Sequence, residues 1–200
     1  MRYYLATQGP LGATDANFAH TKFVEVYNSD LANTLGNCLH RITNMTRRYF
    51  DGRLPAQDEP TNRVEHLRVS AVTAAEDVEK YLNVLDLRGL CENALSIIRA
   101  IDACIDHTEP FKLVKDPSKR GQVGMILYTC AEAMRIASLL LWPIMPDKAE
   151  EIWRRLSCND YGKRLANGGT GELFQWIKWG QLEPGQTIHH DKALFPRSAP

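Results

Sequence analysis

Two asparagines and an arginine recur at four-residue spacing in NSDLANTLGNCLHR, residues 28–41. In a helix, Asn33, Asn37 and Arg41 would lie one turn above the next. Their amides and guanidinium can make paired hydrogen bonds to the edge of a nucleic-acid base. The alternative is an ordinary solvated face, but Glu, Lys or Gln would form such a face more cheaply, since asparagine is a poor helix former.

A second candidate is the segment DHTEPFK, residues 106–112. Pro110 must end the preceding helix because it lacks an N–H donor and clashes with the turn before it. Phe111 then falls at a chain reversal, where an exposed ring could stack on an unpaired base. The alternative is that Phe111 simply covers the end of the helical core.

Motifs for catalysis or metal binding are absent from the sequence. It contains no glycine-rich phosphate loop, no GxSxG, no HExxH and no Cys/His signature, so we expect no catalytic residue and no metal site in this chain. The five cysteines form no CxxC pair, and the four within helix-like patterns are interpreted as small buried hydrophobic residues in a reducing compartment. The adjacent His189 and His190 are expected to be solvated.

Composition limits the possible partners. The 200 residues are 44% hydrophobic and 24% charged, with a formal net charge of zero, as in ordinary globular proteins. This balance argues against a broad basic surface, so any nucleic-acid contact must be local. No apolar run approaches the roughly 20 residues of a membrane span, and the N-terminus does not resemble a signal peptide. We expect a cytoplasmic protein without a membrane partner.

Apolar residues at alternating spacings of three and four predict the elements that position these side chains. The predicted helices cover residues 21–49, 61–86, 87–107, 123–141 and 146–156. Beyond residue 158 the pattern fits either a strand or an irregular cover, and its two tryptophans suggest that it packs back on the helices. The predicted fold is therefore all-α, an antiparallel helical bundle with a short irregular C-terminal tail.

Several segments, in order, resemble the methionyl-tRNA synthetase family. MRYYLATQGPLGATDANF resembles the segment after that family's KMSKS-type loop, and FVEVYNSDLANTLGNCLHRITNMTRRYFDGRLP resembles the first helix of its anticodon-binding domain. ACIDHTEPFKLVKD, LLLWPIMPDKAEEIWRRL and LFPR follow in the same order, so the resemblance covers essentially the whole chain. It implies a bundle of the class I aminoacyl-tRNA synthetase anticodon-binding type. The implied divisions are 1–17, a linker or stem-contact remnant of the catalytic part; 18–158, the bundle; and 159–200, the tail packing on it.

The resemblance also implies roles for individual residues. Asn37 and Arg41 match the pair that recognises anticodon bases in the family, and Asn33 is a further candidate one turn earlier. Phe111 follows Pro110 at the position where the family commonly has a tryptophan stacked on the first anticodon base. Phenylalanine keeps the π-face with less area, so stacking should survive at reduced strength. Asp106 matches an acidic position near that platform.

The implied function is recognition of the CAU anticodon in the loop of methionine tRNA. A catalytic domain of the same parent chain would use ATP and magnesium to join methionine to the tRNA. This chain lacks the HIGH-like and KMSKS motifs, so we expect it to resemble the C-terminal part of a larger enzyme, to need no cofactor and to be inactive alone. Two alternatives remain: the equivalent domain of another class I synthetase, and a helical protein-interaction bundle without RNA function, which the neutral charge mildly favours.

Overall fold

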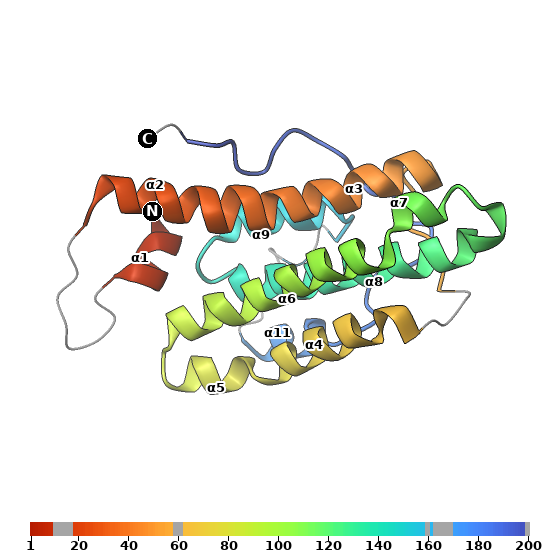
Figure 1. Cartoon of the computed structure of the whole chain (residues 1–200). Helices are drawn as coiled ribbons and strands as arrows, with labels where there is room; N and C mark the ends of the chain where they lie inside the picture. The colour runs from red at the N-terminus through yellow and green to blue at the C-terminus, as the bar shows by residue number, and fades with distance from the viewer. Residues whose placement is uncertain (10–17, 58–61, 159–160, 162–169, 199–200) are drawn as a thin grey trace.

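The protein is mainly helical in the part that the structure, a computed structural model, describes: residues 1–9, 18–57, 62–158, 161 and 170–198 (Figure 1). No strand occurs in these ranges, and a single antiparallel bridge joins Arg53 to Thr187. The predicted all-α class is confirmed. The α-helices are α1 Arg2–Gln8, α2 His20–Val26, α3 Asn37–Phe50, α4 Glu65–Glu76, α5 Val78–Asn83, α6 Leu87–Thr108, α7 Pro110–Leu113, α8 Arg120–Leu141, α9 Pro146–Arg155 and α11 Thr170–Trp176. A π-helix, η1 Tyr27–Gly36, and two 3-10 turns, η2 Asn62–Val64 and η3 Pro117–Lys119, complete the described elements.

The long helices lie alongside one another and alternate in direction along the chain. Figure 1 shows α2, η1 and α3 as one continuous rod, with α4 and α5 running back, α6 running forward and α8 running back again. Helix α6 packs against both α8 and α4. The rod therefore runs parallel to α6, which brings the asparagine-bearing face beside the end of α6 that leads to Phe111.

Helix α8 is the centre of the core. Its side chains from Val123 to Leu141 are buried almost without exception, including those that face away from α6. The stretch 117–141 is the one described helix long and apolar enough to cross a membrane, and 94% of its most apolar window is buried inside the bundle. A helix that is apolar on all sides is expected at the centre of a soluble fold as well as in a membrane.

The rod departs from the uniform α-helix predicted over 21–49. Between Tyr27 and Gly36 it widens into a π-helix, in which the N–H of Asn37 donates to the carbonyl of Ala32, five residues earlier. The Thr34 hydroxyl also donates to the carbonyl of Ser29, at 2.8 Å. Such segments are rare and concentrate at functional sites. Hydrophobic periodicity does not predict them, because the buried residues still recur every three or four positions.

One other predicted helix is divided, and the next one agrees with the prediction. The helix expected over 61–86 is divided into η2, α4 and α5, with Asp77 between the last two. Helix α6 begins as predicted because the Asp86 carboxylate accepts a hydrogen bond from the N–H of Gly89, 2.8 Å away, which caps the helix. It ends at Thr108, and Glu109 then takes a left-handed conformation with φ 48°.

The segment after residue 170 packs back on the bundle. Helix α11 replaces the predicted strand alternative, which is wrong for the described residues, and an irregular path follows from 177 to 198. This path buries Leu182, Ile188, Leu194 and Phe195. Residues 159–160 and 162–169, in the first half of the predicted tail, lie outside the described residues.

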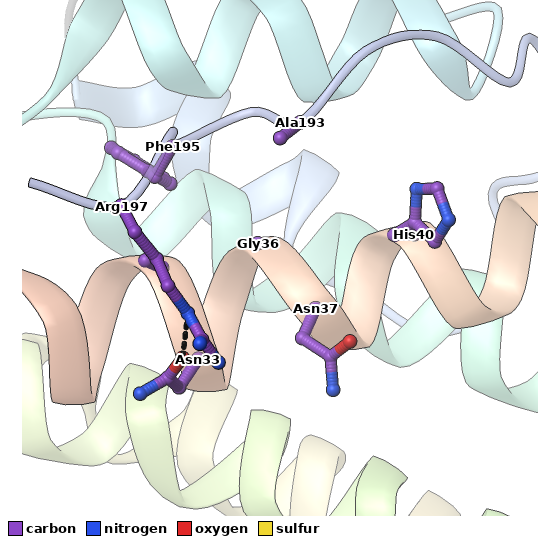
Figure 2. A pocket seen from close by; sticks show the side chains of 8 residues that line it. Asn33, Gly36, Asn37, His40, Ala193, Phe195 and Arg197 are labelled. Carbon is purple, nitrogen blue, oxygen red and sulfur yellow. Dashed lines mark hydrogen bonds between the residues drawn. The ribbon is translucent and has the colours of Figure 1, made fainter.

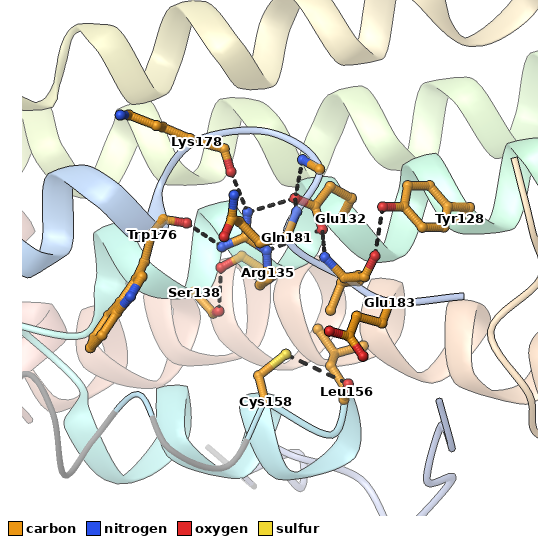
Figure 3. A network of polar contacts seen from close by, with 12 residues as sticks. Tyr128, Glu132, Arg135, Ser138, Leu156, Cys158, Trp176, Lys178, Gln181 and Glu183 are labelled. Atoms are coloured by element: carbon orange, nitrogen blue, oxygen red, sulfur yellow. Dashed lines mark hydrogen bonds and ion pairs between the residues drawn. The ribbon is translucent and has the colours of Figure 1, made fainter. Parts of the chain in front are cut away.

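A buried ion pair on α8 fixes this segment (Figure 3). Arg135 donates to both carboxylate oxygens of Glu132, at 2.6 and 3.1 Å, and neither side chain is exposed. The arginine also donates to the carbonyls of Trp176 and Lys178, while the Glu132 carboxylate accepts from the N–H groups of residues 180, 181 and 182. The two buried charges are thus hydrogen-bonded to each other and to the backbone between residues 176 and 182.

The cysteines behave as predicted. Cys38, Cys91, Cys104 and Cys130 are buried, Cys158 is half-buried, and all five are free thiols. Burial raises the pKa of Cys91 and of Cys158 to about 12, so both remain protonated and unreactive at neutral pH.

Candidate nucleic-acid interface

The three residues of the polar stripe divide between two surroundings. Asn33 and Asn37 are exposed, and both line an open pocket of about 440 Å³ on the rod (Figure 2). Arg41 lies one turn further on at the edge of the buried face, with 28% of its side chain exposed, and it reaches α6 instead of the pocket. The stripe therefore offers two amides to solvent and one partly buried cation beside them.

The two amides differ in their bonding. The Nε of Arg197 donates to the Asn33 carbonyl oxygen at 3.1 Å, so the far end of the chain orients that amide (Figure 2). The amide of Asn37 makes no hydrogen bond within the described residues. Asn37 thus keeps both its donors and its acceptor available to a ligand.

Arg41 is held by two carboxylates of α6. Its Nη1 lies 2.7 Å from Asp102 and its Nη2 lies 2.5 Å from Asp106. Burial lowers the pKa of Arg41, but hydrogen bonds and charge from Asp106 and Asp102 outweigh it and leave the pKa raised. The guanidinium is therefore always charged, fixed in direction, and still has N–H donors beyond the two used here.

Asp102 is a residue that sequence reasoning missed. Its side chain is 26% exposed, and burial raises its pKa even though Arg41 lowers it. Asp102 and Asp106 are spaced four apart, so both lie on the same face of α6. That spacing was visible in the sequence, but nothing local says which helix the face meets. The structure also gives Asp106, 68% exposed, a direct partner in Arg41.

The predicted aromatic platform lies at the turn after α6. Glu109 is left-handed, Pro110 occupies the first position of α7 and is buried, and Phe111 follows with 42% of its surface exposed. A proline at a helix start loses little because its missing N–H would have no partner there. The ring is therefore available to a ligand, as the chain reversal predicts, while Pro110 anchors the turn.

A histidine pair next to the pocket was not predicted. His40 lines the pocket, and its ring lies 4.4 Å from the ring of His190, centroid to centroid. The Nδ1 of His190 lies 2.9 Å from the hydroxyl of Thr43. His189 is exposed as expected, whereas His190 is half-buried because the tail folds back along the rod. Such a contact joins residues about 150 positions apart and leaves no local signal.

The described residues contain no group of three His, Cys, Asp or Glu side chains that could hold a metal ion. The side chains of this surface offer hydrogen bonding, charge and stacking. Exposed amides, a fixed guanidinium and an exposed ring are the side chains used to recognise unpaired bases.

Similarity to known proteins agrees with this surface. The first 43 residues match the family model described as "tRNA synthetases class I (M)". The methionine–tRNA ligase of Caldanaerobacter subterraneus subsp. tengcongensis is 34% identical over 199 residues, 98% of this chain and 29% of that relative. The Deinococcus radiodurans enzyme is 32% identical over 200 residues, 100% of this chain and 28% of that relative.

Solved structures show the same likeness. The apo methionyl-tRNA synthetase of Mycobacterium tuberculosis covers the whole chain with a TM-score of 0.84 at 27% identity, while this chain covers 38% of it. The same enzyme bound by methionyl-adenylate has a TM-score of 0.81. The chain spans less than a third of the length of these curated relatives, and along nearly all of its own length it is similar to a segment of methionyl-tRNA synthetases.

Proposed function

We propose that this chain binds the anticodon loop of methionine tRNA and recognises its CAU anticodon. The observation that carries the proposal is the pairing of a free, exposed amide at Asn37 with a fixed guanidinium at Arg41 on one helix face. An amide can donate to and accept from the Watson–Crick edge of a base at once, and a guanidinium can donate in pairs. The family resemblance assigns these two positions to anticodon bases.

The other candidate residues support the same mode of binding. Phe111 offers a ring face on which an anticodon base would stack, and Pro110 holds the turn that presents it. Asp102 keeps Arg41 in place, while the more exposed Asp106 is the partner that a base could replace or approach. Asn33 would contribute one turn earlier on the same face.

The activity of a longer protein is part of this proposal. In it, the bound anticodon loop would position the tRNA so that a catalytic domain of the same chain receives the acceptor end and attaches methionine. We assign ATP and magnesium to that catalytic domain, in the part of the relatives that this chain does not cover. We place this work in the cytoplasm.

The test is binding of the 200-residue chain to fluorescent anticodon stem-loops that carry CAU or GAU. We expect the chain to prefer CAU, and we expect Asn37→Ala and Arg41→Ala each to reduce that preference. Arg68→Ala is the matched control, because Arg68 is an exposed arginine on α4 that is also paired with a carboxylate, Glu65. A preference for GAU would point to another class I synthetase. Absence of RNA binding would leave a protein-interaction bundle.

A further inference from the structure

The pocket beside the asparagines has two walls from opposite ends of the chain. The rod supplies Ala32, Asn33, Gly36, Asn37 and His40, and the C-terminal segment supplies Ala193, Phe195 and Arg197 (Figure 2). Ala32 and Gly36 on the rod are small and leave space between these walls. The family-derived positions account only for the first wall, so the role of the second remains to be explained.

The second wall is fixed to the rod. The Tyr27 hydroxyl donates to the carbonyl of Pro196 at 2.9 Å, and Asn28 exchanges two hydrogen bonds with the backbone of Ser198, at 2.9 and 3.0 Å. Lys148 donates to the carbonyl of Leu194 at 2.9 Å, and the ring of Phe195 is buried. These bonds surround Arg197 on both sides, so its position over the pocket follows from the fold.

The pocket favours an anion. None of its eight lining residues is acidic, whereas Arg197 and His40 carry or can acquire positive charge. Arg197 uses only its Nε, on Asn33, so both of its terminal nitrogens keep their donors within the described structure. Arg41, in contrast, is offset by two carboxylates. The pocket therefore presents a positive charge, that of Arg197, which no acidic residue of its lining offsets.

The pKa of the neighbouring His190 indicates the same positive electrostatic surroundings. Burial lowers the pKa of His190, and the charges of His40, Arg47 and Arg155 lower it further, while the carboxylate of Asp191 raises it. A positive surrounding disfavours a second proton on His190 and favours a bound anion. RNA carries an anionic phosphate at every nucleotide, and the N–H donors of Arg, amide and His side chains commonly bind phosphates.

We propose that Arg197, with Asn33 and His40, binds a backbone phosphate of the anticodon loop, next to the bases contacted by Asn37 and Arg41. This inference rests on the proposed function and assigns a separate task within it. The first wall reads bases, and the second wall supplies sequence-independent attraction that sets the register of the loop.

The test separates charge from sequence reading. Binding of CAU and GAU stem-loops is measured from about 50 to about 300 mM KCl for the full chain and for Arg197→Gln, Arg197→Lys and the control Arg68→Gln. We expect Arg197→Gln to weaken both loops about fivefold, to keep their affinity ratio, and to reduce the salt slope by about 0.7, the value for one phosphate of a single strand. Arg197→Lys keeps the charge and should stay within about twofold of the parent. The Arg68 control should not change.

Each other result overturns the assignment. Unchanged affinity and slope in Arg197→Gln, with the CAU preference intact, would remove the phosphate contact and leave the anticodon proposal standing. A changed CAU:GAU ratio would make Arg197 a base contact. Absence of RNA binding by the parent chain would overturn both proposals. Thermal unfolding of each variant checks that the exposed substitution leaves the fold intact.

Discussion

At the scale of single residues, the sequence predicts which chemical groups are exposed better than it predicts which residues they contact. Asn37 and Phe111 are exposed, as their types and positions suggest, because an amide in a helix and a ring after a proline each have local signatures. The partners of Arg41 and Asn33 have no such local signature in the sequence. Arg41 meets α6 more than 60 positions away, and Asn33 meets Arg197 at 164 positions.

Phe111 gives the clearest prediction at this scale. Phe111→Ala should weaken binding of the CAU stem-loop by roughly 1–3 kcal/mol, the contribution of one stacked base, and Phe111→Trp should strengthen it because the indole offers a larger face. Fluorescence anisotropy measures both. Val84→Ala, an equally apolar and more exposed position before α6, is the control and should have no effect. Equal affinity of the Ala, Phe and Trp forms would mean that no base stacks there.

At the scale of elements, periodicity locates the helices but not their irregularities. The apolar pattern places the long helices within a few residues but not the short helices α1, α7 and α11. Asp86, Pro110 and Pro146 mark where three helices begin. It does not reveal the π-helix at Tyr27–Gly36 or the path after residue 176, because both depend on hydrogen bonds to particular distant or unusually spaced groups.

The buried pair on α8 predicts a large stability effect. Arg135→Met should lower the free energy of unfolding by about 3–5 kcal/mol, because it leaves the Glu132 charge buried without its cation and two backbone carbonyls without donors. Urea unfolding measures the loss. Arg154→Ala, which breaks the exposed pairs with Glu151 on α9 and with Asp191 in the C-terminal segment, should cost less than about 1 kcal/mol. Similar losses in both variants would mean that the pair does not hold the C-terminal segment.

Helix α9 predicts how stability depends on pH. Hydrogen bonds from Arg154, with further ones from Arg155, hold the pKa of Glu151 at about 2, below its ordinary value of 4.5, although burial raises it. A lowered folded-state pKa gives stability that is complete above pH 4.5 and is lost as pH falls toward 2. Glu151→Gln should therefore be less stable than the parent near neutral pH, and chemical denaturation should show the gap narrowing below pH 4.5. A gap that is constant with pH would exclude this ion pair as its source.

At the scale of the whole molecule, zero net charge conceals a local asymmetry. The carboxylates of α6 offset the charge of Arg41. The adjacent pocket, in contrast, is lined by Arg197 and His40 and by no acidic residue. The neutral total therefore does not argue against RNA binding at one place. The C-terminal segment creates that asymmetry, and no local pattern in the sequence places it against the rod.

The most direct measurement of the central claim is the affinity of the chain for the CAU stem-loop and for three loops that each differ from it at one anticodon base. All four loops share the same stem and the same phosphates, so only base recognition can separate them. We expect each single base change to weaken binding to the parent chain. In Asn37→Ala and in Arg41→Ala, a change of the base that the lost side chain contacts should no longer weaken binding. Equal affinity for the four loops would contradict anticodon recognition and reduce the interface to phosphate attraction.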